Sequence, residues 1–270
     1  MSWIITGSQR YQPAALLDQF PGAAAAYSLR NLVGTSNPAV VRVRRANDNA
    51  EQDFTATEVS DGTLATWVGV GNDGFVRTWY DQSGNSRHAE QITTSAQPKI
   101  VGNGLVILDG SKPAIEFNGT SMNMTAAFSA SLSQPNTIFN VVQPRSFTEL
   151  KYIVDGITDL ARHVIYILTD QRVVIYADNS INSNITYGFQ RRLLTGLFNT
   201  SSSQIWLDSV SVATGNSGSA PVSGFTIGSR YTGVGVWDGF MQEIVFYDSN
   251  QSTNRAAIEA NINAHYSIYP

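Results

Sequence analysis

The 270-residue sequence contains no cysteine, only three histidines and few charged residues. The absence of cysteine excludes disulfide bonds, thiolate zinc sites and cysteine nucleophiles. Charged residues make up 14% of the chain, against about 25% in typical soluble proteins. Ser, Thr, Asn, Gln and Gly take their place, and such an uncharged polar composition suits β-sheets and sugar-facing proteins better than helix bundles.

Long apolar runs and a basic surface are also missing. No segment approaches the roughly 18 apolar residues of a membrane-spanning helix, and the N-terminal MSWIITGSQRYQ lacks the pattern of a signal peptide. The formal net charge of -4 argues against a face for nucleic acid. The densest basic cluster, VRVRR at Arg42, Arg44 and Arg45, is predicted to be a solvated or salt-bridged strand face. We therefore expect no nucleic-acid partner and no membrane insertion.

Strand signals dominate from about residue 99. Short β-branched and aromatic segments, such as KYIVDGI, HVIYILTD and RVVIYAD, recur between Gly, Asn, Asp, Ser or Pro residues. Their intervals lie near the 8–12 residues typical of sandwiches, and no helical pattern separates them. The pattern predicts an all-β sandwich of two antiparallel sheets, with TDQR as a hairpin turn and DSVSVATGNSGSAP as a polar meander between strands.

A few short helices are predicted around this β-rich body. AAAAYSLRNL, residues 23–32, is rich in helix formers, and residues 63–70 form a second candidate. STNRAAIEANINAHYSIYP predicts a helix near the C-terminus, capped by Ser252 or Thr253 and packed across one end or edge of the sandwich. We divide the chain into an N-terminal lead-in or tether, residues 1–21, with a helical turn in PAALLDQF, and one domain, residues 22–270.

Few residues show the spacing of a known catalytic or metal site. No phosphate-loop, dinucleotide or zinc-protease motif is present, and the three histidines share no ligand spacing (His88, His163 and His265). We predict no cofactor. Ca²⁺ stays an open alternative without supporting spacing, because loop oxygens are available at Asp48, Asn49, Asp73 and Asp81.

Carboxylates could hydrolyse a carbohydrate, and aromatic rings could bind one. Hydrolysis of a glycoside needs two carboxylates, and the strands offer many without singling out a pair (Asp81, Glu116, Asp155, Asp159, Asp208, Asp238 and Glu243). No catalytic residue is predicted. Sugar C–H faces pack on aromatic rings, while sugar hydroxyls need polar partners. In RYTGVGVWDGF the glycines are expected to leave the rings open, which predicts a carbohydrate-binding site at Arg230, Tyr231, Trp237 and Asp238.

Three segments between Gly22 and Gln91 carry a family resemblance. GAAAAYSLRNL, AVVRVRRANDNAEQDF and GNDGFVRTWYDQSGNSRHAEQ follow one another in this order. Together they resemble the concanavalin A-like (LamG-like) jelly-roll domain of phage virion proteins, which is related to the catalytic domain of family-54 α-L-arabinofuranosidases. The match is strong over residues 22–92 and weaker over 222–268, where GFMQEIVFYD and AAIEANINAHYSIY resemble the end of such domains. Residues 99–221 match in strand character only.

The resemblance to the arabinofuranosidases does not extend to their catalytic carboxylates. It places the acid/base Asp of those enzymes within GSRYT, residues 228–232, where this chain has Ser229 and Arg230. It places their other carboxylate near DGITDLA, residues 155–161, but the motif is not reproduced. Those enzymes also use disulfides, whereas this chain has no cysteine. The resemblance therefore implies a protein that is not an enzyme, with α-L-arabinofuranosidase activity as the alternative.

The resemblance implies a role in the phage particle. We expect a virion structural protein of the tail or the head decoration, made in the host bacterial cytoplasm without a signal peptide. Its lectin-like domain would contact host-surface polysaccharide or neighbouring virion subunits, and it would form a homo-oligomer. A purely structural virion subunit without a sugar site is a third hypothesis.

Overall fold

The computed structural model describes residues 14–270, which fold mostly into strands. The first part of the chain forms α1 (Leu16–Gln19), β1 (Ala23–Ser28), β2 (Ala39–Arg45), β3 (Glu51–Thr55), α2 (Ala56–Ser60), α3 (Thr63–Val68), β4 (Gly74–Trp79), β5 (Ala89–Glu90), β6 (Lys99–Gly102), β7 (Leu105–Val106), β8 (Leu108–Asp109) and β9 (Lys112–Pro113). The rest forms β10 (Ile115–Asn118), β11 (Met124–Leu132), β12 (Asn136–Pro144), β13 (Lys151–Asp155), β14 (Val164–Ile167), β15 (Arg172–Tyr176), β16 (Ser180–Thr186), β17 (Arg192–Phe198), β18 (Ser203–Leu207), β19 (Val210–Gly215), β20 (Val222–Ile227), β21 (Asp238–Tyr247) and α4 (Arg255–Tyr266). Two 3-10 turns lie at Thr94–Ala96 and Thr200–Ser202.

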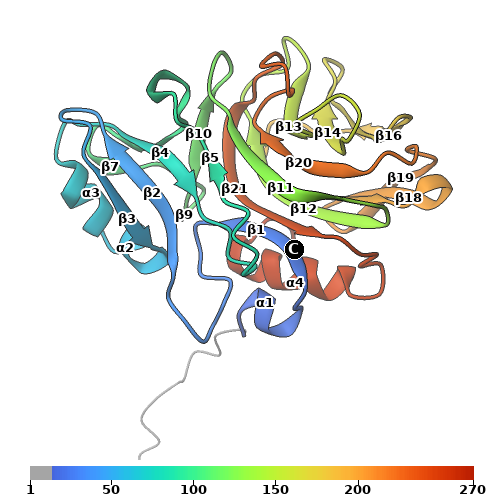
Figure 1. The fold of residues 1–270 in the computed structure, drawn as a ribbon, viewed down its shortest axis with the longest axis horizontal. Coiled ribbons are helices and arrows are strands. Elements are labelled where there is room, and N and C mark those ends of the chain that lie inside the picture. The colour runs from blue at the N-terminus through green and yellow to red at the C-terminus, as the bar shows by residue number, and fades with distance from the viewer. Residues whose placement is uncertain (1–13) are drawn as a thin grey trace, which may run out of the picture.

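Two curved layers of antiparallel strands face each other across the main core (Figure 1). One layer runs β21–β12–β17–β18–β19, with β1 and β10 along the other side of β21. The second runs β5–β11–β20–β13–β14–β15–β16. The predicted all-β sandwich is confirmed. The two layers are hydrogen-bonded into one curled sheet, because β5 pairs with β4, β4 with β6, and β6 with β10.

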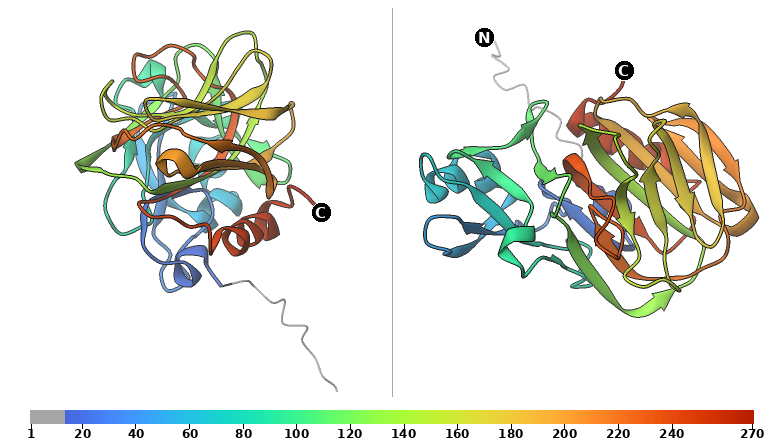
Figure 2. Two further views of the ribbon diagram at one scale, coloured as in Figure 1. Left: turned by 90° about the vertical axis from the view of Figure 1, so that its right-hand side faces the viewer. Right: turned by 90° about the horizontal axis from the view of Figure 1, so that it is seen from above.

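A lobe of β2, β3 and β4 with the helices α2 and α3 lies at one end of the sandwich (Figures 1 and 2). Thr55 caps α2 in a reciprocal box, because its side chain accepts from the Glu58 amide while the Glu58 carboxylate accepts from the Thr55 amide. The predicted helix at 63–70 is confirmed as α3. None of the helices in residues 14–270 has the length and apolar character needed to cross a membrane.

Aromatic side chains from both layers meet in the main core. Phe128 of β11, Phe225 of β20 and Phe246 of β21 have ring centroids 5.0–5.8 Å apart. Burying each such ring stabilises the fold by about 1.5–3 kcal/mol. Because these strands come from distant parts of the sequence, the contacts fix how the two layers face each other.

A second core lies on the outer face of β12, β17 and β21, under the C-terminal helix α4. Ile258 and Ile262 of α4 are fully buried there, and Leu16 of α1 joins the same cluster. The predicted C-terminal helix is confirmed, but it begins after Asn254 and covers a sheet face, not the expected end or edge. Leu16 also shows that packed structure begins before residue 22. Residues 1–13 of the predicted tether lie outside the described part of the chain.

The predicted helix at residues 23–32 is wrong, since the alanines form strand β1. All six residues of β1 are buried, and Ala26 pairs with Val245 of β21. Ala25 contributes to the main core and Ala26 to the core under α4, so both faces of the strand are covered. Helix propensity is a weak preference, and here burial between two cores outweighs it.

Two further local predictions are corrected and two are confirmed. Residues 210–215, predicted as part of a polar meander, form β19 and pair with β18. The VRVRR segment is a strand, β2, and Arg42 and Arg45 form ion pairs as expected. Arg44 is instead buried and donates to Gln97. The TDQR turn joins β14 and β15 as predicted.

Candidate functional site

A cluster of tyrosines lies on the outer face of the second layer, on β13, β14 and β15. Side chains alternate along a strand, so the inward residues of these strands enter the main core, Ile165 and Ile175 among them. The intervening positions point outward and carry Tyr152, Tyr166 and Tyr176. The sequence pattern K-Y-I-V-D, V-I-Y-I and R-V-V-I-Y thus supplies a core face and an aromatic face at once.

All three tyrosines line one pocket, and two of their rings stack on each other. Tyr152 and Tyr166 lie directly opposite each other on β13 and β14, with ring centroids 5.1 Å apart and planes at 17°. Tyr176 lies one strand further along, beside Val164. Burial raises the pKa of Tyr152 and of Tyr166, so both phenols stay protonated at neutral pH. Within residues 14–270 none of the three hydroxyls has a hydrogen-bond partner, which leaves them available to a ligand.

Arg162 forms one wall of this surface and is held by a buried carboxylate. The Asp155 side chain is fully buried and accepts from Arg162 Nε at 2.9 Å and from Nη2 at 2.8 Å. It also accepts from the backbone amides of Gly156 and Tyr231. Burial lowers the pKa of Arg162, but the hydrogen bonds and charge of Asp155 outweigh it and raise the pKa overall. The guanidinium is therefore a permanent cation.

Gly156 permits this arrangement. A Cβ at that position would lie 2.5 Å from Arg162 Cβ and 2.7 Å from the carbonyl oxygen of Ala161. Real Cβ atoms do not approach other atoms so closely, so only glycine lets the 156–162 loop fold back over the end of β13.

The loop between β20 and β21 forms the second wall. Tyr231 lies against both arginines, with Arg162 Cζ 4.9 Å and Arg230 Cζ 5.4 Å from its ring centroid. Its hydroxyl donates to Asp159 at 3.1 Å, which ties the two loops together. Gly235 has φ +61°, and a Cβ there would lie 2.6 Å from the Tyr152 ring. The glycines of this loop thus allow it to pack closely on Tyr152.

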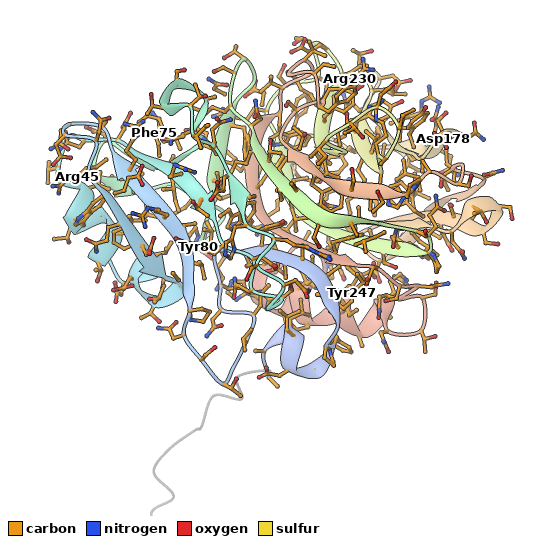
Figure 3. All side chains as sticks on the ribbon, in the orientation of Figure 1. Arg45, Phe75, Tyr80, Asp178, Arg230 and Tyr247 are labelled. Atoms are coloured by element: carbon orange, nitrogen blue, oxygen red, sulfur yellow. The ribbon has the colours of Figure 1, made fainter. Side chains whose placement is uncertain are left out.

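Together these side chains line a shallow, open pocket of about 230 Å³. This is smaller than the roughly 300–1,000 Å³ of pockets for drug-sized ligands, so it suits one sugar residue better than a large cofactor. The lining residues are Tyr152, Arg162, Val164, Tyr166, Tyr176 and Arg230. Arg230 lies at the upper end of the sandwich, far from Arg45 and Tyr80 in the lobe (Figure 3).

The predicted site residues divide between this pocket and other surroundings. Arg230 lines the pocket, and Tyr231 packs against its two arginines. Trp237 is fully buried in the main core, so the expectation that its ring is open is wrong. Asp238 accepts from Arg145 Nε at 3.0 Å and does not line the pocket. In this loop Gly235 allows close packing on Tyr152, while residues 232–234 are exposed and Trp237 is buried.

Sequence reasoning missed the three outward tyrosines and Arg162. The hairpin turn at residues 169–171 already placed Tyr166 and Tyr176 on one face, two positions apart across neighbouring strands. That signal could have found two of the three tyrosines. The pairing of β13 with β14 spans a long loop, so neither Tyr152 nor Arg162 could be placed without the tertiary structure.

The structure brings two pairs of candidate carboxylates together, each around an arginine. Arg162 binds Asp155 and Asp159, and Arg145 binds Glu116 and Asp238. The other candidates have separate partners: Asp81 accepts from the amides of Ala26 and Arg87, Asp208 pairs with Arg192, and Glu243 with Arg30.

Metal ligands do not gather in the described part of the chain. Residues 14–270 contain no group of three or more His, Asp or Glu side chains arranged to hold a metal ion. Among the loop oxygens considered for Ca²⁺, Asp48 binds Arg45, Asp73 binds Lys99, and Asp81 accepts from backbone amides. His163 is buried against the ring of Phe198, with centroids 4.3 Å apart.

Comparison with known proteins shows which solved structures have a similar fold. No family model matches the chain, and no curated protein matches it. A GH54 a-l-arabinofuranosidase soaked with a cyclic sulfate inhibitor has a TM-score of 0.69 at 14% identity, covering 90% of this chain and 62% of that one. An arabinofuranosidase complexed with arabinofuranosyl-alpha-1,2-xylobiose has a TM-score of 0.67 at 15% identity, covering 92% and 64%.

These similarities confirm the predicted concanavalin A-like jelly roll and its likeness to the GH54 arabinofuranosidases at the level of the fold. The chain spans less than two thirds of the length of either structure. At such low identity the fold alone is shared. What the pocket binds must be argued from its own residues.

Proposed function

We propose that the protein binds carbohydrate in the tyrosine-lined pocket without hydrolysing it. The observation that carries this proposal is the pocket itself, where three outward tyrosines with free hydroxyls meet two arginines. The C–H face of a sugar ring packs on Tyr166 and Tyr176, and its hydroxyls bond to the phenols and guanidinium groups.

The rim of the pocket supports a binding role. Leu160, in the loop beside Arg162, is 86% exposed, and Val234, in the loop beside Arg230, is 55% exposed. The Tyr231–Asp159 hydrogen bond joins these two loops. These two side chains lie in the loops that carry Arg162 and Arg230, so they would extend the contact to neighbouring sugar units.

The state of Asp155 argues for binding over hydrolysis. Its two oxygens already accept four hydrogen bonds, and its side chain has no exposed surface. A nucleophilic carboxylate must present a free lone pair to the substrate, and Asp155 has none to offer. Asp159 is 67% exposed and would have to supply both catalytic roles.

The particle in which this domain works is proposed from the sequence resemblance. We propose a phage virion protein of the tail or the head decoration, assembled as a homo-oligomer with other virion subunits. The pocket would then bind host-surface polysaccharide. Mass spectrometry of purified virions tests this assignment: the chain is expected among the particle proteins, and its absence would refute the assignment while leaving the pocket's binding chemistry untouched.

A glycan array on the purified protein tests the binding proposal. We expect binding to a defined glycan class, and the substitutions Tyr166→Ala and Tyr176→Ala each to weaken it by about tenfold, or 1.4 kcal/mol. Tyr80→Ala is the matched control, because Tyr80 lies in the distant lobe and donates to Asp53 (Figure 3). A folded protein that binds no glycan supports a purely structural role, and equal losses for all three variants would place the site elsewhere.

The shared fold with arabinofuranosidases favours hydrolysis as a second candidate. The assay is release of 4-nitrophenol from 4-nitrophenyl α-L-arabinofuranoside. We expect no turnover above the solvent rate. Turnover that disappears in Asp159→Asn and in Asp155→Asn/Asp159→Asn would make the protein a glycosidase and overturn the proposal of binding alone.

A further inference from the structure

Arg230 differs from Arg162, the other arginine of the pocket, because no carboxylate of the described residues pairs with it directly. Within residues 14–270 no carboxylate lies within ion-pair distance of its guanidinium, and none of its three nitrogens donates a hydrogen bond to the protein. Nε is inaccessible to solvent and has no acceptor. The guanidinium lies against the ring of Tyr231, with Cζ 5.4 Å from the ring centroid. A buried donor without an acceptor is costly for a fold, and this donor belongs to a guanidinium at a pocket, which points to an acceptor on a ligand.

The other charges near the pocket are already paired. Arg162 is held by Asp155 and Asp159, and Lys151 donates to Glu149 and to a backbone carbonyl. Asp155 and Asp159, which together carry one charge more than Arg162, do not line the pocket. Among the lining residues Arg230 is therefore the guanidinium that has no carboxylate partner, and it lies next to the tyrosines.

We propose that the pocket selects an acidic sugar residue, one that carries a carboxylate, and that Arg230 binds this group. This inference rests on the proposed carbohydrate-binding function and adds the ligand class. The planar guanidinium matches a carboxylate with two parallel hydrogen bonds. A uronate places its carboxylate at the edge of the sugar ring, so the ring packs on the tyrosines while the carboxylate meets Arg230.

The size and charge of the pocket favour a uronate over a more highly charged group. A volume of about 230 Å³ accommodates one sugar ring with its substituents. A single unpaired cation matches a single negative charge, whereas a phosphate carries more charge than Arg230 alone neutralises. A sulfate ester is singly charged but tetrahedral, and it extends further from the ring than a carboxylate does.

The experiment compares three ligands by calorimetry on the full chain: a uronate oligosaccharide, its methyl ester and a sulfated neutral oligosaccharide. Galacturonate, glucuronate and mannuronate oligomers serve as probes. Methyl esterification removes the charge and preserves the ring, so it is expected to weaken binding by about ten- to a hundredfold. Arg230→Gln is expected to cause a similar loss for the uronate and little loss for the ester. The affinity for the uronate should also fall as salt rises.

Arg45→Gln is the matched control, because it removes the same charge from the distant lobe (Figure 3). It is expected to leave uronate binding unchanged. Equal affinity for the uronate and its ester, or equal losses in both arginine variants, would overturn the assignment of Arg230 while leaving sugar binding intact. Preference for the sulfated ligand would overturn the choice of a carboxylate. Binding to a neutral glycan that depends on Tyr166 but not on Arg230 would do the same and would support the proposed function.

Discussion

The Asp155–Arg162 ion pair offers the sharpest test of how the pocket is held. Both side chains are nearly inaccessible, at 0% and 9% exposure. Asp155→Asn preserves the shape of the side chain but removes its charge. The new NH₂ group then faces N–H donors of the protein, because both Asp155 oxygens accept from such donors. Breaking a buried ion pair from one side costs about 3–5 kcal/mol, because the remaining charge stays desolvated. The Arg162–Asp159 contact persists, so we expect a loss of about 3 kcal/mol.

Urea and thermal unfolding measure this loss. For a domain of this size, 3 kcal/mol lowers Tm by roughly 6–12 °C. Asp159→Asn is the control, since its carboxylate binds the same arginine from an exposed position and should cost under about 1 kcal/mol. The double variant Asp155→Asn/Arg162→Met removes both buried charges and should be more stable than the sum of the single effects predicts. Two results together would refute the reasoning that the buried ion pair stabilises this side of the pocket. They are similar losses in Asp155→Asn and Asp159→Asn, and additive effects in Asp155→Asn/Arg162→Met.

Three further predictions concern backbone, pH and packing. Gly235→Ala should weaken sugar binding and destabilise the fold by about 1–3 kcal/mol, because its Cβ would collide with the Tyr152 ring. Gly233→Ala is the control: its φ is +82° but the space around it is open, so it should lower stability without affecting sugar binding. Calorimetry measures the binding of both variants, and urea unfolding measures their stability. Burial lowers the pKa of His163 from 6.5 to about 4, so below pH 6.5 the unfolded chain binds a proton that the folded chain does not. The free energy of unfolding should therefore fall by up to about 3 kcal/mol as the pH drops from 6.5 to 4. His163→Gln should reduce this dependence on pH in urea titrations, and an unchanged dependence would contradict the prediction. Trp237→Ala should cost about 3–5 kcal/mol in unfolding experiments, and a loss of sugar binding without a loss of stability would return Trp237 to the binding site.

Strand pattern and turn chemistry predicted most of the fold. The hairpin at residues 169–171, the strand β2 and the terminal helix α4 follow from local sequence, because their signals act over a few neighbouring residues. Strand β1 does not, since its alanines favour a helix and only burial between two cores makes them a strand. That information lies in distant elements, β21 and α4.

The sequence predicted part of the candidate site, namely Arg230 and Tyr231, but not Arg162. Arg230 and Tyr231 were found because aromatic and charged residues among glycines indicate a surface loop. Trp237 was misplaced because the same pattern also fits a loop that packs tightly against the sheet, as Gly235 does on Tyr152. The contribution of Arg162 depends on a buried carboxylate seven residues earlier and on a loop that folds back over it, so local sequence could not place it.

A crystal structure with the strongest-binding uronate oligosaccharide tests the central claim most directly. The account predicts one sugar ring against Tyr166 and Tyr176, with its carboxylate within hydrogen-bond distance of Arg230 and its glycosidic bond intact. A sugar bound elsewhere, such as the pocket beside Arg30 and His265, would contradict the assignment of the site. A cleaved sugar in the tyrosine-lined pocket would contradict binding without hydrolysis.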